Sequence, residues 1–249
     1  MAAPIVFPFT PNFEFYTSNP MGPWDYHLVS LKQWREGYKF MYKKLIVDPG
    51  VYSIRGKSEY PHIGAYPLQD LPPNVYWTIP DYPHDMKPKL SADECIQKTL
   101  ENIDRWKHLS NTIVSVQSEF LNFDSFQINW LKFYPLGERL AIGNLCKATK
   151  SSFITKVLKF AFTHNPEKKW IHIFGLRRRG IEWILNQHLD FLVSCDSQKW
   201  RLTPFWRTCH EAHGKGEKAK LKDDSKLYEF LTREYLANMD SREKQTRLF

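Results

Sequence analysis

The sequence predicts an α/β fold of the TIM type, a (β/α)8 barrel, and three observations support this. The chain has 249 residues, close to the length that one such barrel needs. Short β-rich runs recur along it and are apolar on both faces, as buried parallel strands are. Helical patterns separate several of these runs, which indicates βαβ units and a parallel sheet. We therefore expect a single barrel domain over residues 1–249.

Seven runs are the predicted strands of this barrel. They span Phe13–Thr17, Lys44–Val51, Val75–Pro80, Thr112–Gln117, Leu140–Leu145, Trp170–Leu176 and Leu189–Cys195. This number of strands favours closure into a barrel over an open sheet. The eighth strand is not evident in the sequence. It is expected either within Arg201–Thr208 or not as a regular strand at all, in which case the barrel is irregular there.

Helices are expected between several of the strands. The first, Ser91–His108, begins with Ser91 as its N-cap and has Glu94 three residues later, the pattern of a capping box. The region at about 214–249 is first a charged loop and then helical. The other helical patterns lie at Ser151–Thr163, Arg179–Gln187 and Leu227–Met239.

Composition narrows the class of protein. Apolar residues make up 42% of the chain and charged residues 25%, as in a soluble globular protein. The 4 cysteines form no CxxC pair and suggest reduced thiols. We see neither a signal peptide nor an apolar stretch of about 20 residues that could span a bilayer. The expected location is therefore the cytoplasm, with no membrane partner. The net charge of +8 favours a polyanionic partner such as nucleic acid.

Polar residues and glycines follow the predicted strands at the end where barrels collect their chemistry. Each aspartate could instead be a helix N-cap or an Asx-turn residue. Their occurrence at equivalent strand ends favours a polar cup that binds a ligand. His172 lies inside an apolar strand, so we expect a core or supporting histidine rather than a base. The residues of the cup are Asp48, Asp81, Gln117, Gly143, Asn144 and Asp196.

Short sequence segments around these residues resemble the motifs of the tRNA-guanine transglycosylase family. IVDPGVY, at 46–52, resembles the family's DSGG-aromatic segment. TIVSVQS resembles the strand that ends in its base-reading glutamine, and RLAIGNL resembles its AGGL strand. WIHIFGL and LDFLVSCDSQKW resemble the strand before its Met-Gly pair and the strand that ends in its nucleophilic aspartate. All occur in the family's order, roughly from Asp48 to Trp200.

The resemblance implies an α/β barrel that exchanges guanine in a nucleic acid for a 7-deazaguanine base. Asp196 would be the nucleophile that attacks C1′ of the sugar, and Asp48 the general acid/base that serves the leaving and entering bases. Such chemistry resembles that of retaining glycosidases, which also use a carboxylate nucleophile and a second acid. Base contacts would come from Asp81, Gln117, Gly143, the Asn144 N–H, the Leu145 carbonyl, and the rings of Tyr52 and Phe174.

The sequence also departs from the tRNA-acting members of this family. Their zinc pattern, C-x-C-x-x-C followed by a histidine, is absent. Cys209, His210 and His213 lie close together but do not match a four-ligand spacing, so we expect no metal and no other cofactor. From a chain of this length we expect no appended RNA-binding domain. These departures favour the compact DNA-acting relatives of phages, archaeal viruses and bacterial modification islands, and such a protein could be virus-encoded.

The expected substrates are therefore DNA and a free 7-deazaguanine base such as 7-cyano-7-deazaguanine. Arg177, Arg178 and Arg179 follow the sixth strand and are expected to contact phosphates, with a solvated charged face as the alternative. A homodimer or a partner in a modification complex is also consistent with the sequence. Other functions stay open: the same exchange on tRNA, an N-glycosidic hydrolase that uses the same aspartates, or a non-catalytic nucleic-acid-binding subunit.

Overall fold

A computed structural model describes residues 12–16, 26–31, 34, 42–50, 72–84, 90–148, 150–176 and 178–196. These residues lie in the first of the two units into which the chain divides, Met1–Ser197 and Gln198–Phe249. Several predictions fall outside the described residues. They concern Tyr52, Arg177, the segment Arg201–Thr208, the cluster Cys209, His210 and His213, and the helix Leu227–Met239.

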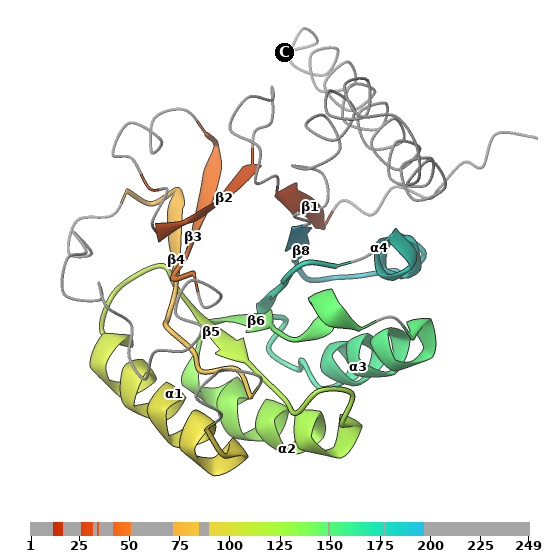
Figure 1. Ribbon diagram of the computed structural model, residues 1–249. Coiled ribbons are helices and arrows are strands. Elements are labelled where there is room, and N and C mark those ends of the chain that lie inside the picture. The colour runs from red at the N-terminus through yellow and green to blue at the C-terminus, as the bar shows by residue number, and fades with distance from the viewer. Residues whose placement is uncertain are drawn as a thin grey trace, which may run out of the picture. The chain divides into compact units, whose positions relative to one another are not determined.

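The strands form an 8-stranded sheet in which every observed pair is parallel. Its order, β1-β8-β7-β6-β5-β4-β3-β2, follows the chain around a ring (Figure 1). The end strands β1 and β2 lie against each other without pairing, so the barrel is nearly closed. The predicted TIM-type fold is confirmed. The strands are β1 (Phe13–Tyr16), β2 (Tyr26–Ser30), β3 (Lys44–Asp48), β4 (Val75–Thr78), β5 (Thr112–Val116), β6 (Arg139–Ile142), β7 (Trp170–Ile173) and β8 (Val193–Asp196).

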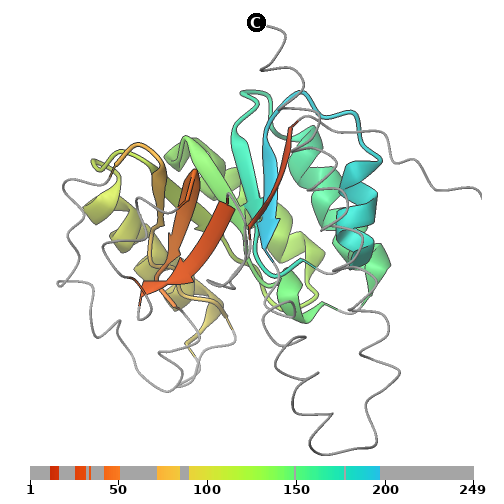
Figure 2. The same ribbon diagram turned by 90° about the horizontal axis from the view of Figure 1, so that it is seen from above.

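Helices connect the strands from β4 onward and cover the outside of the sheet (Figures 1 and 2). The predicted capping box is confirmed, because the Ser91 hydroxyl accepts the Glu94 N–H at 3.2 Å and the Glu94 carboxylate accepts the Ser91 N–H at 2.8 Å. The helices are α1 (Ala92–Trp106), α2 (Phe123–Phe133), α3 (Ser151–Thr163) and α4 (Arg178–Leu185).

The strand that the sequence did not reveal is β2, Tyr26–Ser30. It lies between the first and second predicted strands, so the eighth strand of the sheet is near the N-terminus and is not the segment Arg201–Thr208 proposed for it. The irregular part of the barrel is the open seam between β1 and β2. Only Leu28 and Val29 are buried apolar residues of this short strand, and so its sequence contains no apolar run.

Helix α2 was also missed. Its buried residues Phe126, Asn129, Trp130 and Phe133 have helical spacing, and Asn122 caps its N-terminus. However, Ile128 and Leu131 are 65% and 61% exposed. These apolar residues on the solvent face obscure the amphipathic pattern.

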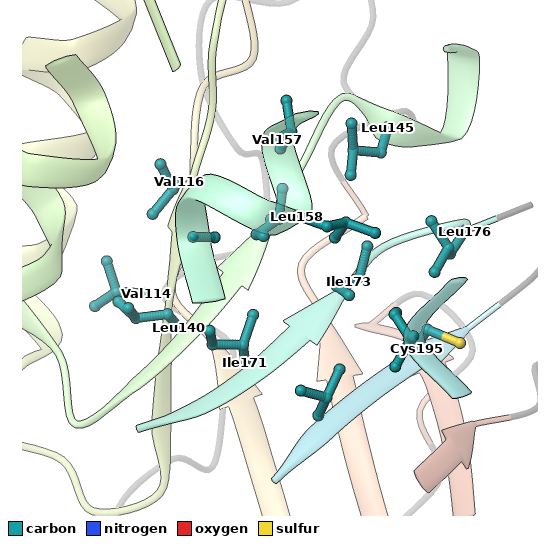
Figure 3. Close-up of a cluster of buried hydrophobic side chains, with 14 of the residues drawn as sticks. Val114, Val116, Leu140, Leu145, Val157, Leu158, Ile171, Ile173, Leu176 and Cys195 are labelled. Carbon is teal, nitrogen blue, oxygen red and sulfur yellow. The ribbon is translucent and has the colours of Figure 1, made fainter. Parts of the chain in front are cut away.

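Two apolar layers hold the barrel together. The outer layer lies between the sheet and the helices, where strand residues such as Val114 and Ile171 meet Val157 and Leu158 of α3 (Figure 3). The inner layer consists of strand side chains that fill the barrel, as the alternation of successive strand residues requires. Its buried members are Tyr16, Leu28, Ile46, Ile113, Ala141 and Trp170, none of which comes from the described helices.

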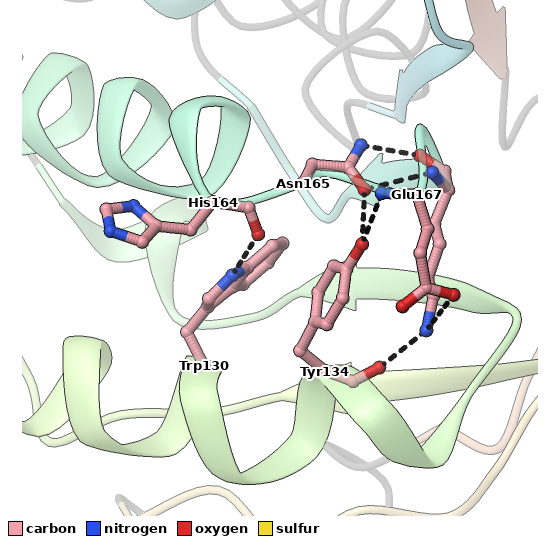
Figure 4. Close-up of polar contacts among 6 residues, drawn as sticks. Trp130, Tyr134, His164, Asn165 and Glu167 are labelled. Atoms are coloured by element: carbon pink, nitrogen blue, oxygen red, sulfur yellow. Dashed lines mark hydrogen bonds and ion pairs between the residues drawn. The ribbon is translucent and has the colours of Figure 1, made fainter.

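Polar contacts fix α2 to the loop that leads from α3 into β7 (Figure 4). The Trp130 indole N–H donates to the His164 carbonyl at 3.0 Å. The Tyr134 hydroxyl donates to Asn165 Oδ1 at 3.1 Å and accepts the Glu167 N–H at 3.1 Å. These bonds hold the helices at the N-terminal ends of the strands, opposite the predicted site.

Candidate active site

Asp48 and Asp196 both face the interior at the C-terminal ends of their strands. Asp48 ends β3 two residues after Ile46, a member of the inner layer, and therefore lies on the same face. Asp196 ends β8 and pairs in register with Tyr16, another member of that layer. The two carboxylates thus meet at one mouth of the barrel, which is where α/β barrels place their chemistry.

Asp81 lies three residues after β4, and it interacts electrostatically with Asp48, as Asp48 does with Asp196. It is 3% exposed, as is Asp196. Desolvation raises the pKa of Asp81 to about 7, against a hydrogen bond from Gln117 that lowers it, and the charge of Asp48 raises it further. Desolvation likewise raises the pKa of Asp48 to about 6, with the N–H of Gly50 acting against it and the charge of Asp196 adding to it. The carboxylates are therefore near enough to influence one another.

Asp48 also forms a local turn. Its Oδ1 accepts the Gly50 N–H at 2.9 Å, and Gly50 has a φ of 78°, in the left-handed region that suits glycine. Asp48 therefore forms the Asx turn that the sequence predicts as the alternative to a functional role. The turn and a chemical role are compatible, because the turn holds Oδ1 and leaves Oδ2 for other contacts.

Gln117 links Asp81 to Gly143. Its Nε2 donates to Asp81 Oδ2, while its buried Oε1 has no hydrogen-bond partner among the described residues. Its side chain lies directly over Gly143, where an added Cβ would overlap the Gln117 amide. Its carbonyl accepts the Asn129 side-chain N–H at 2.8 Å. Gly143 is therefore required for the position of Gln117, and the bare oxygen is available to a ligand.

Asn144 and Leu145 follow directly on this rim. Asn144 has a φ of 62°, a left-handed conformation that asparagine tolerates, and its side chain donates to the Ser118 carbonyl. Leu145 is 2% exposed and begins a short 3-10 turn (Leu145–Lys147), and its carbonyl already accepts the Ala148 N–H at 3.1 Å. A contact from the Leu145 carbonyl to a base would use its second lone pair.

Asp196 is held by β7 and the turn that follows it. The Gly175 N–H donates to Asp196 Oδ1 at 2.8 Å, and Gly175 has a φ of 62°. His172 Nε2 lies 3.5 Å from the same oxygen. The Leu176 N–H donates to the Asp196 carbonyl at 3.0 Å. Both the side chain and the backbone of Asp196 are therefore anchored to the end of β7.

Phe174 is partly buried and directly precedes Gly175, whose N–H holds Asp196. Its ring packs against the inner layer and meets the His172 ring edge-on, with centroids 4.8 Å apart. It therefore presents an apolar surface next to the polar groups of the mouth. Arg179 is exposed in the first turn of α4, and of Arg178 only the backbone position is described.

Several residues that support the carboxylates at the mouth of the barrel had no role predicted from the sequence. Gly175 falls within the predicted strand Trp170–Leu176 and received no role, although its N–H holds Asp196. Ser194 lies inside β8 and bonds to His172, and Asn129 reaches Gln117 from α2. Gly175 could have been suspected from its place after a buried strand. Nothing in the sequence pairs Ser194 with His172, because that contact depends on the register of β7 and β8.

The described residues contain no group of His, Cys, Asp and Glu side chains that could hold a metal ion. No helix within the described ranges is long and apolar enough to cross a membrane.

The fold and the mouth together define a parallel α/β barrel with a cluster of carboxylates at the C-terminal ends of its strands. Comparison of the chain with protein-family models and with curated proteins finds no match. The resemblance to the transglycosylase family therefore stays a prediction drawn from the sequence motifs.

Proposed function

We propose that this protein is a base-exchange glycosyltransferase that replaces guanine in DNA with a 7-deazaguanine base. The observation that carries the proposal is the convergence of Asp48, Asp81 and Asp196 at one mouth of the barrel, with Gln117 bonded to Asp81. A single carboxylate after a strand is commonly a turn residue. Several carboxylates together, of which Asp196 raises the pKa of Asp48 and Asp48 raises that of Asp81, indicate chemistry.

The first step is nucleophilic displacement at the sugar. Asp196 attacks C1′ and forms a glycosyl ester, while the bond from C1′ to the purine nitrogen breaks and its electron pair goes to the base. A carboxylate beside C1′ stabilises the oxocarbenium character that develops there. The anchored geometry of Asp196 suits this role because a nucleophile must be held close to the atom it attacks.

Asp48 supplies the proton that the departing base needs. With a pKa of about 6, it is protonated in part near neutral pH and can act in both directions. It protonates the leaving guanine and then, as a carboxylate, accepts a proton from the incoming base. This exchange of roles is what a symmetric reaction requires.

The pair Asp81 and Gln117 reads the polar edge of the purine. Guanine presents N–H donors on that edge, which a carboxylate accepts, and Gln117 adds an amide with a buried, unpartnered oxygen. A 7-deazaguanine carries the same edge as guanine, so the pocket accepts both the leaving and the entering base. The pocket therefore suits a reaction in which a second base takes the place of the first. The ring of Phe174 provides an apolar face for the base, which must leave the stack to reach the site.

The nucleic-acid substrate is supported by charge and by the family resemblance. The net charge of +8 suits a polyanion. The choice of DNA over tRNA rests on the motifs and on the missing zinc pattern.

The test is a base-exchange assay with radiolabelled 7-cyano-7-deazaguanine and either duplex DNA or folded tRNA. Label that enters DNA and is lost in Asp196→Ala is the expected result. Asp104→Asn is the matched control, because Asp104 is an exposed carboxylate with an exposed Lys107 partner. Label in tRNA instead would keep the chemistry and overturn the substrate.

If label enters neither nucleic acid, the release of guanine from unlabelled DNA is measured next. Release of guanine without exchange would establish a hydrolase in place of the proposed enzyme. DNA binding with neither release nor exchange would establish the non-catalytic subunit.

A further inference from the structure

Inside the barrel, a chain of polar contacts runs from β7 to β8 beneath Asp196. The Trp170 indole N–H donates to Ser194 Oγ at 2.7 Å, and Ser194 Oγ lies 2.8 Å from His172 Nδ1. His172 and Ser194 are 0% exposed. Such a buried chain must satisfy its donors and acceptors internally, so its proton positions can be worked out.

The starting point is Trp170, whose indole nitrogen can only donate. Ser194 Oγ is therefore the acceptor of that bond, and its own hydroxyl hydrogen is available for His172 Nδ1. If Nδ1 donated to Ser194 instead, the Ser194 hydroxyl hydrogen would have no acceptor among the described residues, and an Nε2 lone pair would face the Asp196 carboxylate at 3.5 Å. Nδ1 is therefore the acceptor, and a singly protonated ring carries its proton on Nε2. This matters because the ring nitrogen that carries the proton is set by the bond that the other nitrogen makes.

His172 Nε2 has no hydrogen-bond partner among the described residues, and it lies 3.5 Å from Asp196 Oδ1. That separation is longer than a hydrogen bond but within reach of one when a site closes on its substrate. The Gly175 N–H already donates to the same oxygen at 2.8 Å. The Gly175 N–H and His172 Nε2 are therefore both near Oδ1 of Asp196, and neither contacts Oδ2.

We infer that His172 is a positioning residue for Asp196. Together with the Gly175 N–H it holds Oδ1 of Asp196 in place, so that Oδ2 is the atom that attacks C1′. The inference rests on the proposed function for the identity of the reaction. The Oδ2 lone pair forms the new bond to C1′, the C1′–nitrogen bond breaks toward the purine, and the proton for the purine comes from Asp48. His172 gives up no proton in this step.

The test compares two variants that differ in where they place an amide N–H. Glutamine carries its amide nitrogen near the place of Nε2, whereas asparagine places it near Nδ1. Single-turnover formation of the covalent adduct, measured against DNA concentration, should be within about fivefold of wild type for His172→Gln and about 10- to 100-fold slower for His172→Asn. Half-saturating DNA should stay unchanged in both. Equal losses in the two variants would overturn the inference, because a purely structural histidine would tolerate neither amide better.

A second measurement does not depend on activity. Ring-¹⁵N-labelled histidine in the full chain reports the tautomer of each of the 9 histidines, and His172→Gln identifies the signal of interest by its loss. A proton on Nε2 in wild type, and a mixture of tautomers in Ser194→Ala, are expected. A proton on Nδ1, or on both nitrogens, would overturn the positioning scheme. If wild type forms no adduct with any nucleic acid, the proposed function and the assignment of Oδ2 both fail, while the tautomer still decides whether His172 donates toward Asp196.

Discussion

The two ends of the barrel interior differ in how their charged side chains are paired. At the N-terminal ends of the strands, Lys44 and Glu14 form an ion pair at 2.5 Å, and the Tyr16 hydroxyl donates to Glu14 at 3.1 Å. Lys44 also lies over the rings of Tyr26 and Trp170, 5.9 and 5.6 Å from their centroids. We call this group, Glu14, Lys44, Tyr26 and Trp170, the floor.

Among the described residues, the charged side chains that gather at the mouth are carboxylates. Asp48 and Asp196 form no ion pair with a lysine or arginine among the described residues. Desolvation and the charge of a neighbouring carboxylate disfavour the ionised forms of Asp48 and Asp81, and both pKa values are raised. The floor therefore uses charge to hold the strands together, whereas the mouth keeps its carboxylates in a costly state that a ligand can relieve.

The largest expected effect concerns the protonation of Asp48. Because its pKa is raised to about 6, the protonated acid that serves the leaving base is lost as pH rises through that value. Ionisation of Asp81, which has a pKa of about 7, offsets this loss up to that pH. Above it, single-turnover adduct formation should fall about tenfold per pH unit, and Asp48→Asn should slow it at least about 100-fold and remove that fall. Stopped reactions between about pH 5 and pH 9 measure this. Glu14→Gln, at the floor, should keep the wild-type profile, and a rate that climbs steadily to pH 8 would contradict the role of Asp48.

Much of this contrast could be foreseen from the sequence and part of it could not. The mouth was predictable because each carboxylate follows an apolar run, and parallel strands bring equivalent ends together. The floor was not. Glu14 and Lys44 are 30 residues apart, and their pairing depends on a barrel that brings β1 close to β3 across β2.

The same limit explains the missed elements. Strand β2 has too few apolar residues to stand out, and it becomes recognisable only when its pairing with β3 is known. The roles of Gly175 and Ser194 likewise depend on contacts between neighbouring strands. Local patterns predict which residues end a strand, but the partners of those residues are set by register.

A smaller loss of activity is expected at the rim of the mouth. In Gly143→Ala, the added Cβ would overlap the Gln117 amide, so the glutamine must move away from Asp81. We expect adduct formation to fall about 10- to 100-fold, as displacement of a positioning group by about 1 Å does. Competition by free guanine should weaken in parallel. Gly137→Ala, a glycine that packs against Val114 far from the carboxylates, controls for strain and should keep full activity in the folded fraction.

The floor is expected to show the reverse behaviour, with a loss of stability and no change in chemistry. Lys44→Met leaves Glu14 without its cation, and the two side chains are only 29% and 11% exposed. The free energy of unfolding should fall by about 2 kcal/mol, less than for a fully buried pair. Urea unfolding measures it. Lys107→Met, which removes an exposed pair with Asp104, should leave the free energy of unfolding nearly unchanged. Equal effects of the two variants would mean that the floor pair is not structural.

The smallest effect tests whether the mouth is costly to keep. Because the pKa of Asp81 is raised to about 7 from 3.8, the folded state binds its proton more tightly than the unfolded state does. Stability from this group is therefore fully present below about pH 4 and is lost as pH rises through about 7. Asp81→Asn cannot ionise, so at pH 8 it should be more stable than wild type by about 1 kcal/mol, allowing for the weaker bond from Gln117.

Denaturant unfolding at pH 5 and pH 8 measures this difference, which should shrink at the lower pH because wild-type Asp81 is then protonated in the folded state. Asp190→Asn is the matched control: the pKa of this exposed carboxylate is lowered by Lys168, so its removal should bring no gain at pH 8. A destabilised Asp81→Asn at pH 8 would mean that the ionised carboxylate is stabilised in the folded protein. The mouth would then resemble the floor, and the contrast between the two ends of the barrel would be lost.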